Sequence, residues 1–174
     1  MQTPSWKTTV AGAAAVVLAS AAAVVVSQLP SAAEDTPPSI VEDYSYPGAA
    51  QVLAQRGIKL IKGDGHITLV SCGSTPNNPP ADLILVQSND LTLPAGINFC
   101  FKATGTTGLL TMEIPQVYFV RGDSTRTIAA KVEVKDEPTV VEVEEVIPAE
   151  WQPVGVGQGR GDATILELRY PFTS

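Results

Sequence analysis

The chain has 174 residues, two cysteines and a formal net charge of −7 at pH 7. This acidic balance argues against binding nucleic acid or an anionic membrane through bulk charge, because partners of like sign repel each other. The length suits one domain preceded by a leader, and composition alone does not identify an activity.

The first segment, residues 1–33, has the three-part layout of a secretory signal peptide. Lys7 supplies positive charge, residues 10–26 form an uncharged run of small and apolar side chains, and Pro30 precedes small residues up to Ala33. We expect cleavage after Ala33, which gives a secreted protein with no membrane insertion after cleavage. The alternative is an uncleaved membrane anchor, although this run is at the short end for a span.

Residues 34–46 are polar and aperiodic, which predicts a flexible linker. A short helix follows. Pro47 is tolerated in a first helical turn, and Gly57 can end the helix. Val52 and Leu53 are expected to face the core.

The segment 58–72 reads IKLIKGDGHITLVSC and contains the only histidine of the chain. Its pattern predicts strands over 58–62 and 66–72, joined as a tight hairpin by Gly-Asp-Gly. Asp64 and His66 could form an acid–base pair, but the sequence indicates no nucleophile beside them. We therefore interpret GDGH as a turn and expect no catalytic residue.

Short apolar runs alternate with turns over the rest of the chain, giving eight or nine expected strands. Residues 82–88 are apolar on both faces, as in a central strand. Pro115 is expected to end a strand over 108–114, and Glu145 to break the phase of its strand. Cys100 is expected opposite the core, with Asn98 and Lys102. The expected core-facing residues are Ile97, Phe99, Phe101, Ile128, Ala130, Val132, Val134, Val141, Val143, Thr164, Leu166, Leu168 and Tyr170.

These elements predict an all-β fold with one short N-terminal helix. An antiparallel β-sandwich, jelly-roll-like, or a small barrel both fit several short strands separated by Gly, Pro, Asn and Asp. Residues 47–174 would form this single domain.

Cys72 and Cys100 are expected to form a structural disulfide, because an even cysteine count is typical of exported proteins and no CxxC motif is present. One histidine and two distant cysteines do not give zinc-ligand spacing. The acidic segment 133–150 could attract calcium, but it lacks a DxDxDG loop. We expect no metal and no cofactor.

Two RGD tripeptides, 121–123 and 160–162, lie where turns are expected. Gly-Asp is common turn chemistry, so each aspartate is expected to brace its own loop rather than to mediate cell adhesion. The loops 73–81 and 154–161 are the candidate binding loops, because binding residues concentrate on loops held by a rigid scaffold.

Trp151, in the polar stretch AEWQPVG, is the candidate ligand-binding residue. With Tyr170 and one of Tyr118 or Phe119 it could form an aromatic platform for sugar rings. Tyr118 and Phe119 are neighbours on a strand, so they should point to opposite faces and should not both join.

The runs YSYPGAAQVLAQRGIKLIKGDGHITLVSC and FCFKATGTTGLLTMEIPQVYFVRGD resemble a group of short exported proteins of high-GC Gram-positive actinobacteria. The resemblance spans most of the chain after the leader. It implies export and a similar size, and it carries over no catalytic residue.

Three functions remain open. The first is a non-catalytic secreted binding module for an unknown extracellular ligand, such as a polysaccharide, the cell wall or a protein. The second is a secreted structural or interaction protein, or an inhibitor that acts through a loop. The third is a small hydrolase with an acidic pair, for which the sequence marks no pair of carboxylates.

Overall fold

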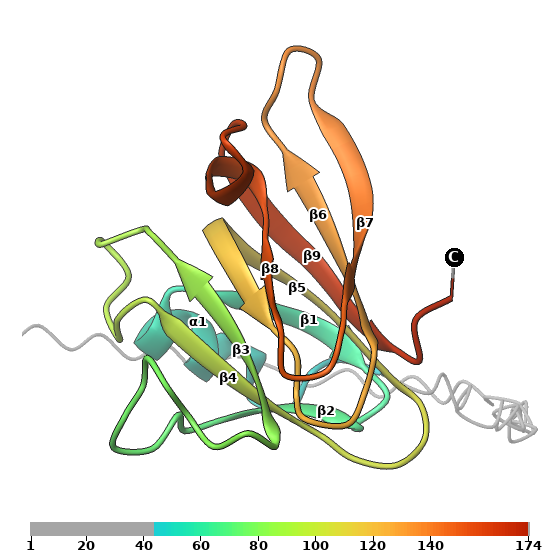
Figure 1. Cartoon of the computed structure of the whole chain (residues 1–174). Coiled ribbons are helices and arrows are strands. Elements are labelled where there is room, and N and C mark those ends of the chain that lie inside the picture. Colours follow the sequence, from blue (N-terminus) through green and yellow to red (C-terminus); the bar gives the residue numbers. More distant parts are fainter. Residues whose placement is uncertain (1–43, 174) are drawn as a thin grey trace, which may run out of the picture. The chain divides into compact units, whose positions relative to one another are not determined.

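The computed structural model describes residues 44–173 (Figure 1). The predicted signal peptide, 1–33, and residues 34–43 of the predicted linker lie outside them. The elements of the described part are α1 (Ala49–Arg56), β1 (Lys59–Gly63), β2 (Ile67–Val70), β3 (Leu83–Ser88), β4 (Asn98–Ala103), β5 (Gly108–Arg121), β6 (Ile128–Val134), β7 (Val140–Val146), β8 (Trp151–Pro153), the 3₁₀ turn η1 (Gly155–Gln158) and β9 (Ala163–Tyr170).

The nine strands pair antiparallel in the order β2-β4-β3-β5-β9-β6-β7, and β1 and β8 both pair with β5. The first half of β5 pairs with β1 and β9, and its second half with β3 and β8. One long strand therefore joins two layers (Figure 1). This confirms the all-β, sandwich-like expectation. The sheet does not close into a barrel, since β2 and β7 remain edges.

One apolar core lies between the layers. Every strand from β1 to β7 contributes to it, and so does β9. Its largest fully buried side chains are Phe99, Phe101, Ile58, Ile67, Ile84, Leu110, Met112, Ile114, Ile128, Ile165 and Leu168. The alternation expected for β4 and β6 is confirmed by Phe99, Phe101 and the inward side chains of β6. The all-buried pattern of β3 confirms a central strand.

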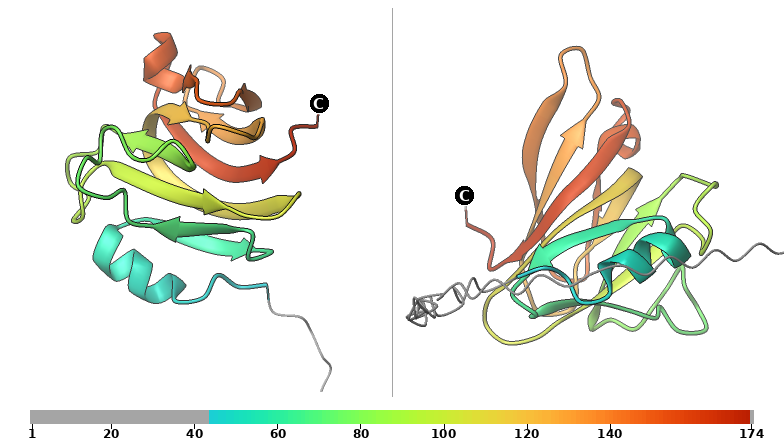
Figure 2. Two further views of the ribbon diagram at one scale, coloured as in Figure 1. Left: turned by 60° about the horizontal axis from the view of Figure 1, so that its bottom comes forward. Right: turned by 180° about the vertical axis from the view of Figure 1, so that it is seen from behind.

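The predicted helix is confirmed. α1 lies against β1 (Figure 2) and ends at Gly57, whose φ of 72° is the left-handed conformation that glycine adopts without strain. Val52 packs on the core, but Leu53 is 46% exposed, so its expected burial was wrong. Within the described residues, no helix is long and apolar enough to cross a membrane.

The predicted hairpin between residues 58–62 and 66–72 is wrong. β1 pairs with β5 and β2 pairs with β4, so Gly63-Asp64-Gly65 carries the chain from one layer to the other. The turn itself is confirmed. Gly65 has a φ of 82°, and the Asp64 carboxylate accepts the His66 backbone N–H at 3.0 Å.

Pro115 does not end its strand, contrary to expectation. β5 runs through it for 14 residues, with register shifts on both sides. The Pro115 carbonyl accepts a hydrogen bond from the Ser88 hydroxyl, and the carbonyl of Gln116, whose φ is 50°, accepts one from the Asn89 N–H. Proline is tolerated here because the irregular register requires no ladder N–H at this position.

The side chains of β7 that were predicted to face the core are also wrong. Val141 and Val143 are about half exposed, and Glu142 and Glu144 lie on the side of Val146. β7 pairs with β6 without a register shift, so Glu145 does not break the strand. At an edge strand the apolar side chains are not forced inward, and the two glutamates instead find polar partners from residues 152–160.

In β9 the expected alignment of Thr164, Leu166, Leu168 and Tyr170 is only half correct. Val132 pairs with Ile165 and Lys131 with Glu167, so Leu166 is an extra residue in the ladder. This bulge reverses the alternation. Ala163 and Ile165 face the core before it, and Leu168 and Tyr170 after it.

Candidate ligand-binding face

The candidate site is the outer face of the layer β4-β3-β5-β8, which we call the outer face. Residues directly opposite each other on paired strands point to the same side of a sheet. The register therefore gives two rows on this side. One row is Asn98, Gln87, Phe119 and Pro153, and the next is Cys100, Leu85, Arg121 and Trp151.

Trp151 lies at one end of this face with 43% of its surface exposed. Its ring meets Phe119 edge to face, with centroids 5.9 Å apart and an interplanar angle of 81°. Tyr118 also contacts Phe119, at 5.1 Å. The expectation that Tyr118 and Phe119 cannot both join was wrong, because a register shift at Tyr118 interrupts the alternation. We call these three residues the aromatic group.

Tyr170 is not part of the aromatic group. It is 2% exposed, and its hydroxyl donates to the Thr104 carbonyl and packs beside Gly108. The Arg126 guanidinium lies 5.2 Å from the centre of its ring. Burial raises the pKa of the Tyr170 phenol. Tyr170 therefore joins the β4–β5 turn to β9, and the predicted platform lacks it.

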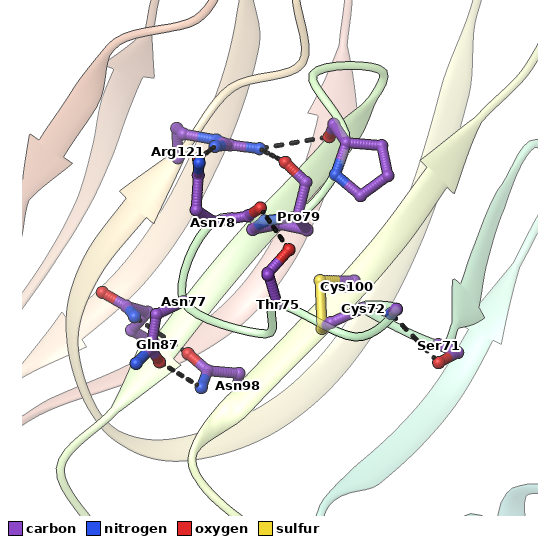
Figure 3. The surroundings of a disulfide bond; sticks show 12 residues. Ser71, Cys72, Thr75, Asn77, Asn78, Pro79, Gln87, Asn98, Cys100 and Arg121 are labelled. Atoms are coloured by element: carbon purple, nitrogen blue, oxygen red, sulfur yellow. Dashed lines mark hydrogen bonds between the residues drawn. A yellow bond between two sulfur atoms is a disulfide. The ribbon is translucent and has the colours of Figure 1, made fainter.

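Arg121 holds loop 73–81 against the outer face (Figure 3). Its guanidinium donates to the carbonyls of Pro79 and Pro80 at 3.1 and 3.2 Å. A longer bond of 3.4 Å reaches the Asn78 side chain. The same guanidinium lies 5.7 Å from the Trp151 ring centre, a cation–π distance. Arg121 thus links the loop to the exposed indole.

A row of amides lies beside the aromatic group. The Gln87 amide donates to the Asn98 side-chain oxygen at 2.8 Å, and the Asn98 amide donates to the Asn77 side-chain oxygen at 2.8 Å (Figure 3). Each amide has two donors and an acceptor with two lone pairs, so this row keeps unused hydrogen-bonding capacity. The row is open to solvent at Asn77, whereas Gln87 is only 8% exposed.

The Cys72–Cys100 disulfide is present, as predicted. Its Cα atoms lie 5.2 Å apart, and it ties the start of loop 73–81 to the middle of β4. With Val70, Leu83 and Leu85 it forms a small apolar cluster beneath the loop. The disulfide, Arg121 and the Asn77–Asn98 bond attach this loop to the sheet at three points.

The second candidate loop, 154–161, borders the other side of the aromatic group. Its turn η1 places Gly157 against the Tyr118 carbonyl, and the Val154 N–H donates to that carbonyl at 3.0 Å. Val156 and Tyr118 line an apolar hollow of about 330 Å³ with Leu91, which is 85% exposed. Both loops predicted from sequence therefore flank Trp151.

Asp64 and His66 remain a turn pair. Their side chains approach to 3.5 Å and are 34% and 47% exposed. The His66 carbonyl accepts the Thr104 N–H at 2.9 Å, which joins this turn to the β4–β5 turn. These contacts are structural and lie away from the aromatic group.

The two RGD tripeptides differ. Arg121, Gly122 and Asp123 are buried, and Asp123 is fully enclosed. Its carboxylate accepts backbone N–H groups from Thr125 and Arg126 and pairs with the Arg126 guanidinium at 2.8 Å, so it braces its loop as expected. In the second tripeptide Asp162 is exposed, and no hydrogen bond forms to its side chain within residues 44–173, so its expected bracing role was wrong.

Three of the seven acidic side chains of segment 133–150 have polar partners in the described part of the chain: Asp136, Glu142 and Glu144. Arg160 forms ion pairs with Asp136, at 2.6 Å, and with Glu142. Glu144 accepts hydrogen bonds from Gln152 and Gln158. The Gly161 N–H and then Arg160 hold the pKa of Asp136 below its usual value. Among the described residues, no group of three His, Cys, Asp or Glu side chains is arranged to hold a metal ion.

No protein-family model matches the chain, and a search of curated proteins gives no match. The function of the outer face is therefore inferred from the positions and contacts of its side chains. Trp151 was predicted from sequence, and Phe119 was one of two alternatives for its platform, but Arg121 and the amide row were not assigned to the site. Of these residues, only Asn98 had a signal in the sequence. The alternation of 97–103 already placed it on the side of Cys100.

Proposed function

We propose that this chain is a non-catalytic secreted module that binds an extracellular polysaccharide on its outer face. The observation that carries the proposal is the half-exposed indole of Trp151, supported by Phe119 and Arg121 beside the amide row. A sugar ring has an apolar face and a hydroxyl edge. The indole suits the first, and side-chain amides suit the second.

The rigidity of this face supports the same function. A ligand that meets preorganised groups loses less free energy to ordering them. The disulfide and Arg121 fix loop 73–81, and the β5–β8 pairing fixes the backbone of Trp151. The side chains that meet the ligand are thus held before it arrives.

The test is retention of the purified protein on insoluble peptidoglycan, cellulose and chitin, with Trp151→Ala and Trp151→Phe variants. We expect Trp151→Ala to weaken binding about tenfold or more, since stacking of this kind contributes on the order of 1–3 kcal/mol. Trp151→Phe should keep part of the affinity. Val141→Ala, which shortens an exposed side chain on β7, serves as the matched control.

Retention that is equal for Trp151→Ala and the wild type would contradict the proposal. Retention on cellulose and chitin, which are uncharged, that high salt abolishes would also contradict it, because such binding is electrostatic and not stacking.

Export belongs to the same proposal. The supporting features are the three-part leader and the disulfide, which persists in oxidising compartments. Intact mass spectrometry of the protein from culture medium should give a chain that begins at Glu34. A chain that keeps residues 1–33 and stays with the membrane would favour the anchored alternative.

A protein partner is the second candidate, and Leu91 is the observation that favours it. Leu91 is 85% exposed beside an apolar hollow, which suits contact with an apolar side chain of a protein. A sugar has no large aliphatic group to make this contact. If no polymer retains the protein, chemical crosslinking in culture medium should capture one partner, and Leu91→Ser should abolish that product.

A further inference from the structure

A second hollow opens on the same layer, beyond the amide row. It measures about 550 Å³ and lies between the end of α1, the segment after β2 and the segment before β4. Arg56, Cys72 and Asn98 are among the residues that line it. The hollow is polar on the side of Arg56 and Asn98, and the disulfide forms part of its wall.

The Arg56 guanidinium is incompletely satisfied in this hollow. One terminal nitrogen donates to the Asn98 carbonyl at 3.1 Å, and the group lies 5.3 Å from the centre of the Phe99 ring. Its Nε is buried and makes no hydrogen bond within the described part of the chain. A buried donor without a partner is costly, so native structures seldom keep one.

The other arginines of the described residues differ from Arg56. Arg126, Arg160 and Arg169 each pair with a carboxylate, and Arg121 is occupied by carbonyls of loop 73–81. No carboxylate of residues 44–173 lies within 4.0 Å of the Arg56 guanidinium. An acidic chain that leaves one partly buried arginine unpaired in a hollow provides a site for an external anion.

We propose that Arg56 binds a carboxylate of the ligand, and hence that the polysaccharide is acidic, with uronic-acid units. This inference rests on the proposed function and names the class of its ligand. The planar guanidinium offers paired donors that match the two oxygens of a carboxylate.

The hollow and the aromatic group belong to one continuous site. Asn98 lines the hollow and starts the amide row, and Ile97 lines both this hollow and the one beside Tyr118. From β4 to β8 the face spans three strand spacings, roughly 14 Å. An oligosaccharide can cross this distance with one unit at Arg56 and another on Trp151.

The charge distribution suits an acidic ligand at this end of the protein. Residues 44–121, which carry the hollow and most of the outer face, hold five basic and four acidic side chains. Residues 122–173 hold five basic and ten acidic ones. The net negative charge of the described chain therefore comes from its C-terminal part, and the strands around Arg56 do not repel an anion.

The experiment compares polygalacturonate, alginate and hyaluronate with their methyl esters, which keep the backbone and lose the carboxylate charge. Isothermal titration of the purified protein should show roughly ten- to hundredfold tighter binding to the acid forms, the range for a charge-assisted hydrogen bond. Arg56→Gln should remove that preference and leave ester binding unchanged. Arg56→Lys should keep part of it, since lysine retains the charge without the fork.

Lys135→Gln is the matched control, because it removes one positive charge from an exposed position between β6 and β7. Equal affinity for acid and ester forms overturns this inference, and so does an unchanged preference in Arg56→Gln. If the wild type also binds neutral polymers through Trp151, the proposed function survives that result. Binding to no polymer at all overturns both. The acid-against-ester comparison on the wild type needs no variant to fold.

Discussion

Asp123 and Asp162 occupy the same position of the same tripeptide, yet their surroundings differ. Asp123 is fully enclosed and neutralised by Arg126, whereas Asp162 is exposed. Asp123→Ala leaves the part-buried Arg126 guanidinium and two backbone N–H groups without their acceptor. We therefore expect it to lower the free energy of unfolding by about 3 kcal/mol. Asp162→Ala should change it by less than about 0.5 kcal/mol. Urea unfolding of the two variants measures both, and similar losses would contradict the assigned bracing role.

Asp136 gives a prediction on pH. Its pKa is lowered in the folded state by the Gly161 N–H and then by Arg160. A lowered carboxyl pKa stabilises the fold above the unfolded value and loses that effect as the pH falls through the folded value. Asp136→Asn should therefore flatten the dependence of unfolding free energy on pH between about 5 and about 2.

Thermal unfolding across that pH range measures the effect, with Asp162→Asn as the exposed control. A variant as acid-sensitive as the wild type would contradict the assigned role of the Asp136 contacts.

At the scale of elements, the disulfide is the main constraint on loop 73–81. Cys72 and Cys100 are 28 residues apart in sequence. By chain entropy, the Cys72→Ala/Cys100→Ala double variant should lose about 3–4 kcal/mol of unfolding free energy. Urea unfolding measures the loss, and thiol titration of the folded wild type should detect no free thiol. A reactive thiol pair in the wild type would contradict the bridge.

Among the strands, the side-chain pattern of β3, β4 and β6 was predicted correctly. β4 and β6 lie between other strands, so their alternation had to follow the core, and β3 is buried throughout. β7 was misassigned because an edge strand can leave Val141 and Val143 exposed. The hairpin at Gly63–Gly65 was misassigned because turn chemistry fixes a bend and does not fix which strands pair.

The site was predictable to a smaller extent. Trp151 was predictable because it is an aromatic residue in a polar stretch, and the two cysteines because they are the only pair in the chain. Phe119, Arg121 and Gln87 become neighbours only through the pairing of β3, β5 and β8, which are far apart in sequence. The contact of Tyr118 with Phe119 depends on a register shift that alternation alone does not predict.

At the scale of the whole molecule, one core joins both layers through β5. We therefore expect a single cooperative unfolding transition. Far-ultraviolet circular dichroism should follow the strands, and fluorescence should follow Trp151, the only tryptophan among residues 44–173. The two midpoints should coincide. Separate midpoints would mean that the layer carrying Trp151 unfolds independently.

The attachment of loop 73–81 has a consequence for when the protein becomes able to bind. A chain with both thiols reduced would hold Asn77 and Asn78 through weaker contacts alone, because the covalent tie at Cys72 is missing. The amide row would then be less ordered, and a ligand would have to order it. Under the proposed function, affinity is thus acquired with oxidation. A newly made chain that follows the proposed export route would bind poorly in the reducing cytosol and reach full affinity only at its destination.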